Sequence, residues 1–183
     1  INYMYRIPLL PTTLKKSIIL ADQQIDQLLL LDFNEVAAGK LTALVDRGAG
    51  RDLFDAFHLF EHPELDIKQL RWLFVIYAAM SHKKNFLEID VKHIVAESTN
   101  LKNKLFPVLK HNSHEKFSSI NTWVNHLTTN VQASFEQLLP FTLQEQQFIR
   151  SVQQNLEIRP ELITTDPDLR EKSARDLIAL DFP

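Results

Sequence analysis

Two short stretches near the amino-terminal end of the chain have the pattern of β-strands. Residues 2–7 alternate loosely between apolar and polar, are rich in aromatic and β-branched types, and are followed by Pro8 and Pro11, which predicts a short strand. Residues 27–33 form an apolar run that favours a second strand, although such a run can also lead into a helix. Because a strand needs a neighbour for its backbone groups, we expect partner strands upstream or within residues 18–33.

The pattern changes to helical spacing at Asn34. Apolar residues then recur every three or four positions, with Asn34 expected as the N-cap and Gly48 as the end of the helix. Beyond the turn that holds Gly48 and Gly50, residues 53–60 predict a second, short helix that ends before Pro63.

Helical patterns account for most of the remaining chain. Residues 65–81 are apolar on most sides and predict a buried helix. A short helix is expected at 90–97, long amphipathic helices at 117–139 and 142–156, and a last helix near 169–180, after a proline-interrupted segment. The expected fold is therefore mainly α, a helical bundle with a small β element at its amino-terminal end.

Composition narrows the class of protein. The 183 residues are 45% hydrophobic, enough to bury the core of one domain or of one domain with an appendage. A net charge of -3 excludes a globally basic nucleic-acid binder, so an RNA partner would need a local basic patch. The absence of cysteine excludes disulfides and thiolate chemistry. No apolar run approaches the roughly 18 residues of a membrane span and no leader is visible, so we expect a cytoplasmic protein.

The chemistry-bearing residues are concentrated around the glycines. All three glycines of the chain lie within residues 39–50, which indicates that backbone freedom is needed there. Lys40 and Arg47 are seven positions apart and share a face of the first predicted helix. Asp52 and Asp55 are three positions apart and share a face of the second. The turn between the helices is expected to fold these two charged faces towards each other.

Such a cluster suits a nucleotide, because lysine and arginine bind phosphate oxygens and a carboxylate can position a metal ion or a hydroxyl. The alternative is structural. Arg51 with Asp52, and Arg47 with Asp55, could be ion pairs that hold a helix corner, and composition alone favours this alternative.

The residues of this stretch also stand in a particular order: Glu35, Lys40, Ala43 and Arg47, followed by Arg51-Asp52-Leu53-Phe54-Asp55. This order resembles the signature of the AbiEii family, the nucleotidyltransferase toxins of type IV toxin-antitoxin systems, in its carboxy-terminal portion. Residues 1–7 and 158–162 resemble the family's flanking segments, whereas residues 65–154 agree only in being helical.

The resemblance implies a polymerase-β-like nucleotidyltransferase that acts in abortive infection. Such an enzyme transfers a nucleotide from a nucleoside triphosphate to a tRNA or protein acceptor with the help of Mg2+. The resemblance assigns Lys40 to the triphosphate, Asp52 and Asp55 to organising the reacting groups, and Arg47 and Arg51 to phosphate binding or to structure. It also implies an antitoxin protein as partner.

The family's first motif, a Gly-Ser turn followed by Asp-x-Asp that holds magnesium, has no counterpart. No Gly-Ser dipeptide occurs, and Asp166-Pro167-Asp168 lacks a preceding glycine turn. Because the chain also opens at Ile1 without an initiator methionine, we expect a fragment that is inactive alone.

The resemblance implies three regions of the chain. Residues 1–33 form the β-rich end of a nucleotidyltransferase core, residues 34–62 a two-helix motif, and residues 63–183 a carboxy-terminal helical bundle. The alternative function is a non-catalytic helical interaction module. His58 and His62 lack the acidic pattern of a zinc protease and are expected to be solvated or capping.

Overall fold

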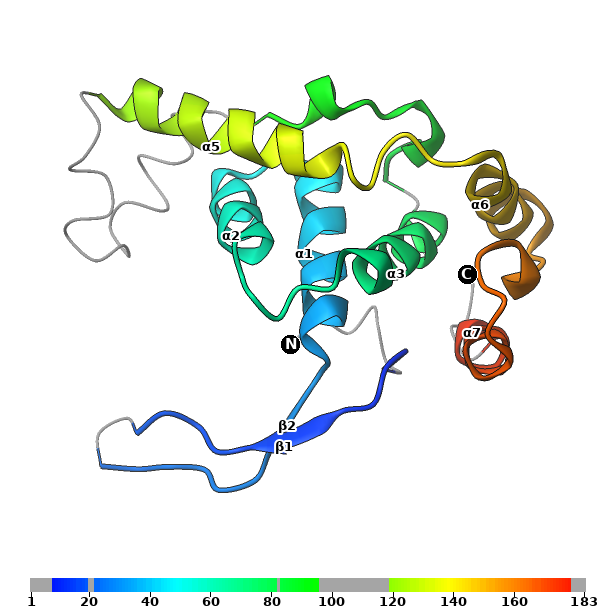
Figure 1. Ribbon diagram of the computed structural model, residues 1–183, viewed down its shortest axis with the longest axis horizontal. Coiled ribbons are helices and arrows are strands. Elements are labelled where there is room, and N and C mark those ends of the chain that lie inside the picture. The colour runs from blue at the N-terminus through cyan, green and yellow to red at the C-terminus, as the bar shows by residue number, and fades with distance from the viewer. Residues whose placement is uncertain (1–7, 20–21, 82, 96–118, 179–183) are drawn as a thin grey trace.

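In a computed structural model, the chain is mainly helical with a small two-stranded antiparallel sheet near its amino-terminal end (Figure 1), which confirms the expected fold class. The structure describes residues 8–19, 22–81, 83–95 and 119–178. The strand expected at 2–7 lies outside these ranges. No helix within them is long and apolar enough to cross a membrane.

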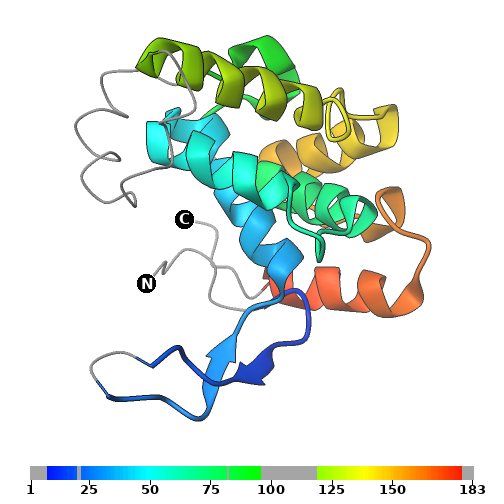
Figure 2. The ribbon, with the colours of Figure 1, turned by 60° about the vertical axis from the view of Figure 1, so that its left-hand side comes forward.

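The sheet consists of β1 (Thr13–Lys15) and β2 (Leu28–Leu30), paired antiparallel. The strand predicted within residues 27–33 is therefore confirmed. Its partner β1, however, is a segment for which no strand was predicted, because three residues are too few to show an alternating pattern. The hairpin extends away from the helices, as Figures 1 and 2 show.

The hairpin exposes aliphatic side chains to an unusual degree. All residues of both strands are exposed. The exposed aliphatic residues of the hairpin and its connections are Leu14, Ile18, Ile19, Ile25, Leu28, Leu29, Leu30 and Leu31. A two-stranded hairpin by itself is only marginally stable in water, and this one has an uncovered apolar surface.

Two consecutive helices, α1 (Phe33–Arg47) and α2 (Gly50–Phe60), form a corner. The predicted end of α1 is confirmed, since Gly48 adopts a left-handed conformation with φ 58°. The predicted N-cap is wrong by two positions. Asp32 caps the helix by accepting a hydrogen bond from the Asn34 backbone N–H at 2.8 Å. The side chain of Asn34 bonds instead to residues at the start of the third helix.

The core is built around α3 (Ile67–Met80), which packs against α1 on one side and α6 (Leu143–Asn155) on the other. Nine residues of α3 are buried, Leu70 and all those from Trp72 to Ala79. This confirms the predicted buried helix. The helix α5 (Ile120–Phe135) lies across α2, and α7 (Pro167–Ile178) follows α6 (Figure 1). The helices α3, α5 and α6 lie within regions predicted to be helical, and α7 begins two residues before the range predicted for it, 169–180.

The helix expected at 90–97 is replaced by a single 3-10 turn, Val91–His93. Asp90 caps this turn through its carboxylate, and its own backbone N–H bonds to the His93 ring at 3.2 Å. These side-chain bonds satisfy N–H groups at the start of the turn, which have no partner within a helix. Residues 96 and 97 lie outside the described part of the chain.

Candidate functional site

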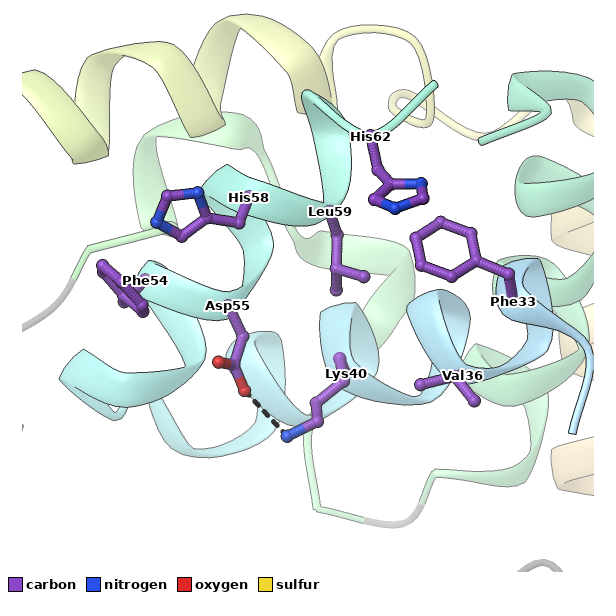
Figure 3. Close-up of a pocket in the computed structure, with 8 residues that line it drawn as sticks. All are labelled: Phe33, Val36, Lys40, Phe54, Asp55, His58, Leu59 and His62. Atoms are coloured by element: carbon purple, nitrogen blue, oxygen red, sulfur yellow. Dashed lines mark hydrogen bonds and ion pairs between the residues drawn. The ribbon is translucent and has the colours of Figure 1, made fainter. Parts of the chain in front are cut away.

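An open groove of about 350 Å³ lies along the corner between α1 and α2. Its floor and walls combine two charged side chains with aliphatic and aromatic ones. The lining residues are Phe33, Val36, Lys40, Phe54, Asp55, His58, Leu59 and His62. Figure 3 shows the side chains of Lys40 and Asp55 pointing towards each other from the two helices.

Lys40 and Asp55 form an ion pair within this groove. The Nζ of Lys40 lies 2.7 Å from Oδ2 of Asp55, and the side chains are 46% and 36% exposed. A pair as exposed as this contributes only about 0–1 kcal/mol to stability. An ammonium has three N–H donors, so Lys40 retains donors for a ligand. Lys40 and one of the two aspartates therefore line the same groove, in agreement with the expectation that the turn folds the two charged faces towards each other.

Arg47 and Asp52 form a different kind of pair. Asp52 is only 1% exposed, and the Arg47 guanidinium donates from Nε to Oδ2 at 2.5 Å and from Nη2 to Oδ1 at 2.8 Å. The hydrogen bond to Asp52 raises the pKa of Arg47 although burial opposes the shift. Both carboxylate oxygens are therefore occupied by a structural partner at the helix corner.

This geometry corrects one of the two pairs in the structural alternative, Arg47 with Asp55, whereas the other pair, Arg51 with Asp52, is present as a long contact. Arg47 is the last residue of α1 and faces the first turn of α2, where Asp52 lies. Asp55 is one turn further along α2 and meets Lys40. Arg51, by contrast, is 61% exposed with its Nε 4.0 Å from Oδ1 of Asp52, and it does not line the groove.

Glu35, the first residue of the signature, is a buried structural ligand for the backbone. Its carboxylate accepts hydrogen bonds from the N–H groups of Leu9 and Leu10, both at 2.9 Å, and from the Tyr77 hydroxyl at 3.1 Å. It therefore joins the amino-terminal segment to α1 and α3. The sequence offered no local signal for this role, because the three partners are 25, 26 and 42 positions away.

Two histidines also line the groove, each against a phenylalanine. The ring of His62 lies 4.3 Å from that of Phe33, with 32° between their planes, and His58 lies 4.4 Å from Phe54 at 73°. Both histidines are exposed, as expected, and the His62 ring accepts a hydrogen bond from a backbone N–H. Their place in the groove was missed, although the spacing of positions 54, 55, 58, 59 and 62 indicates one face of a helix.

The described residues do not fit a magnesium site. Among them, no group of three or more His, Cys, Asp or Glu side chains is placed to hold a metal ion. Both oxygens of Asp52 accept a hydrogen bond from Arg47, and its side chain is buried. Asp166, which belongs to the Asp-x-Asp at 166–168, caps α7 by accepting a hydrogen bond from the Asp168 backbone N–H at 2.9 Å. Asp52 therefore belongs to an ion pair, and Asp166 caps a helix.

Comparison with known protein families indicates the same family as the order of charged residues does. A family model described as nucleotidyl transferase AbiEii toxin, type IV TA system, matches residues 6–175. The match includes the helical middle of the chain, where the sequence pattern alone offered no specific likeness. No curated protein and no solved structure matches the chain.

Proposed function

The chain belongs to the AbiEii family of nucleotidyltransferase toxins of type IV toxin-antitoxin systems, and we propose that its groove between α1 and α2 is part of the site of nucleotidyl transfer. The observation that supports this proposal is the half-exposed pair of Lys40 and Asp55, 2.7 Å apart inside an open groove. The substrate is a nucleoside triphosphate, and the acceptor is an RNA, such as tRNA, or a protein.

Lys40 binds the triphosphate in this proposal. A lysine ammonium forms short, charge-assisted hydrogen bonds to phosphate oxygens. The aliphatic side chains of Val36 and Leu59 line the same groove and exclude some water, which strengthens the attraction between ammonium and phosphate. Asp55 holds the ammonium in the groove until the phosphates arrive, and then organises the reacting groups.

Asp55, not Asp52, is the acidic residue that acts on the substrate. Both oxygens of Asp52 are engaged by Arg47, and its side chain is 1% exposed, so it positions the corner. Arg47 is assigned to structure for the same reason. Arg51, which is 61% exposed at the start of α2, is assigned to the phosphate backbone of an RNA acceptor.

Nucleotidyltransferases generally use Mg2+ to neutralise developing charge, and the described residues provide no site for it. We therefore propose that the Gly-Ser and Asp-x-Asp motif is supplied from outside these 183 residues, and that the chain alone is inactive. Residues 1–33 form the edge of the sheet that carries this motif. The uncovered aliphatic surface of the β1–β2 hairpin supports this assignment, as does its position beside the start of α1 (Figure 2).

The other two predicted regions of the chain have separate roles in this proposal. Residues 34–62 supply Lys40 and Asp55, and residues 63–183 form the helical bundle that supports them. Membership of a type IV toxin-antitoxin family implies an antitoxin partner. The cytoplasm, which contains both nucleoside triphosphates and tRNA, is the compartment that fits this activity.

The test is nucleotide transfer by the intact protein, expressed from its own gene, with radiolabelled nucleoside triphosphates and total tRNA or protein as acceptor. Lys40→Gln and Asp55→Asn should each lower the transfer rate at least about tenfold, because each removes a charge at the reacting groups. Thermal unfolding should hardly change, since the pair is exposed to solvent. Lys68→Gln, which removes an exposed lysine on α3, is the matched control. Full transfer activity in Lys40→Gln would remove this residue from the mechanism.

The second candidate function is a non-catalytic helical interaction module. The exposed hairpin and the lack of a metal site among the described residues favour it. An intact protein that transfers no nucleotide to any acceptor, yet binds its antitoxin, would establish this alternative.

A further inference from the structure

Two pairs of rings lie in the groove on either side of Lys40 and Asp55 (Figure 3). One consists of Phe33 and His62, the other of Phe54 and His58. Neither pair is needed to hold the charged residues in place, because these contact each other directly. Holding the charged residues in place therefore does not explain why these rings lie in the groove.

The pair of Phe33 and His62 has the geometry of a stacking platform. The two rings are 4.3 Å apart and only 32° from parallel, and both line the groove. Phe33 is the first residue of α1, and His62 lies just beyond the end of α2. Since both sit at helix ends, they are held by the two elements that form the groove.

The surface between this platform and Lys40 is apolar. Val36, which is 38% exposed, and Leu59 line it. Along α1, Lys40 follows Phe33 by seven residues, which corresponds to about 10 Å of helix. A nucleoside triphosphate has a flat base at one end and anionic phosphates at the other, with the sugar between them. Its chemistry matches this order of flat rings, apolar surface and ammonium.

We propose that Phe33 and His62 bind the base of the nucleoside triphosphate by stacking, while Lys40 binds its phosphates. This inference rests on the proposed function, because it names a further part of the same site. Base stacking on aromatic side chains tolerates every base, so the platform binds all four nucleoside triphosphates with modest preferences. His62 and Phe33 are thus substrate-binding residues.

The other ring pair is less suited to this role. The rings of Phe54 and His58 are 73° apart, close to edge-on, and Phe54 also contacts the ring of Trp123 at 6.0 Å. Phe54 is therefore part of the packing between α2 and α5. Figure 3 shows Phe54 on the Asp55 side of the groove, so a base placed there would lie beside a carboxylate and away from Val36.

The experiment measures equilibrium binding of ATP, GTP, CTP, UTP and inorganic tripolyphosphate to the intact protein at one fixed Mg2+ concentration. His62→Ala should weaken binding of the four nucleoside triphosphates about fivefold or more. It should leave tripolyphosphate binding unchanged, because that probe has no base. His62→Tyr, which retains a flat ring, should restore nucleotide binding. Phe33→Leu should act like His62→Ala.

The controls separate this inference from the proposed function. His126→Ala removes an exposed imidazole that is tilted by 56° against the ring of Phe57 and does not line the groove, and it should change neither kind of binding. Lys40→Gln should weaken binding of both tripolyphosphate and nucleotides. If it weakens neither, or if the unsubstituted protein binds none of these probes, the proposed function fails. If Lys40→Gln behaves as expected but His62→Ala and Phe33→Leu bind nucleotides normally, or lose tripolyphosphate equally, the stacking platform is wrong.

Discussion

At the scale of single residues, burial divides the charged signature into two groups. Glu35 and Asp52 are 2% and 1% exposed, and their oxygens are occupied by protein donors. Lys40 and Asp55 are about half and one-third exposed and meet in a groove. The first group maintains the helix corner, and the second is accessible to a substrate.

A substitution of Arg47 should reveal the structural role of the first group. Arg47→Ala leaves the buried Asp52 carboxylate without its two hydrogen bonds, at a cost of about 1–3 kcal/mol or more in the free energy of unfolding. Chemical denaturation measures this loss. Arg51→Ala is the control, since Arg51 is 61% exposed, and should change stability by less than about 0.5 kcal/mol. Equal stability of the two variants would contradict the assignment of Arg47 to the corner.

A substitution of Glu35 should release the amino-terminal segment. Glu35→Ala leaves the N–H groups of Leu9 and Leu10 without their acceptor and removes one hydrogen bond of the Tyr77 hydroxyl, which should cost roughly 2 kcal/mol or more. Hydrogen exchange at the Leu9 and Leu10 amides should accelerate more than exchange in α3. Glu157→Ala, at an exposed position, is the control. Unchanged exchange at these two amides would show that another contact holds the segment.

At the scale of elements, α3 is held against α6 by a partly buried ion pair as well as by apolar contacts. The Arg71 guanidinium donates two hydrogen bonds to Glu145, at 2.8 and 2.7 Å, and also bonds to the carbonyl oxygens of Gln137 and Pro140. Glu145 completes the capping box of α6 with Thr142. One arginine therefore joins α3, the connection after α5 and the start of α6.

This pair predicts a pH dependence of stability. Burial by itself would raise the pKa of Glu145, but hydrogen bonds from Arg71 and the Thr142 backbone lower it below the ordinary value of 4.5. A carboxylate with a lowered pKa in the folded state stabilises the protein fully above the unfolded value. This stability is lost as the pH falls below about 4.5, through the folded pKa.

Glu145→Gln should therefore lower the free energy of unfolding at pH 7, by on the order of 2 kcal/mol, and should reduce the further loss on acidification. Urea denaturation between pH 7 and pH 3 measures both effects. The matched control is Glu157→Gln, which removes an exposed carboxylate just beyond the end of α6. An acid-dependent loss of the same size in Glu145→Gln and in the unsubstituted protein would contradict this explanation.

At the scale of the whole molecule, the helical body and the β1–β2 hairpin differ in how they are covered. The body has a core of buried residues from α1, α2, α3, α5 and α6. The hairpin contributes exposed aliphatic side chains and extends from that body (Figures 1 and 2). Its stability in the intact protein should therefore depend on a surface that covers it.

Replacing residues 14–30 by a flexible Gly-Ser linker tests this division. The helical body should retain its thermal unfolding midpoint within a few degrees, because the replaced strands bury little apolar surface against it. Nucleotide transfer by the intact protein should be lost, since the hairpin is the proposed edge of the metal-binding sheet. The control retains the natural hairpin and substitutes only the exposed Gln23. A large fall in the midpoint would place the hairpin in the core of the body.

Much of this fold could be predicted because its helices are long and periodic. The spacing of apolar residues located α1, α2, α3, α5 and α6, and Gly48 was recognisable as the end of α1 because it needs a left-handed conformation. The strand β1 and the 3-10 turn at Val91–His93 were missed, since three residues carry no period.

For the candidate site, the sequence predicted which residues lie near one another but not which of them pair. Two amphipathic helices joined at Gly48 had to bring Lys40 and Arg47 near Asp52 and Asp55. The pattern could not say which cation meets which carboxylate, because that depends on the angle between the helices and on which side of α2 faces the core.

The sequence by itself determined the mainly helical class, the corner between α1 and α2 and membership of the AbiEii family, because periodicity, glycine conformation and the order of charged residues are local properties of the chain. Only the tertiary structure decided that Asp52 is buried under Arg47, that Asp55 remains open beside Lys40, and that two histidines join them in the groove. These outcomes depend on packing between elements, which determines the burial of each side chain and therefore what it can still bind.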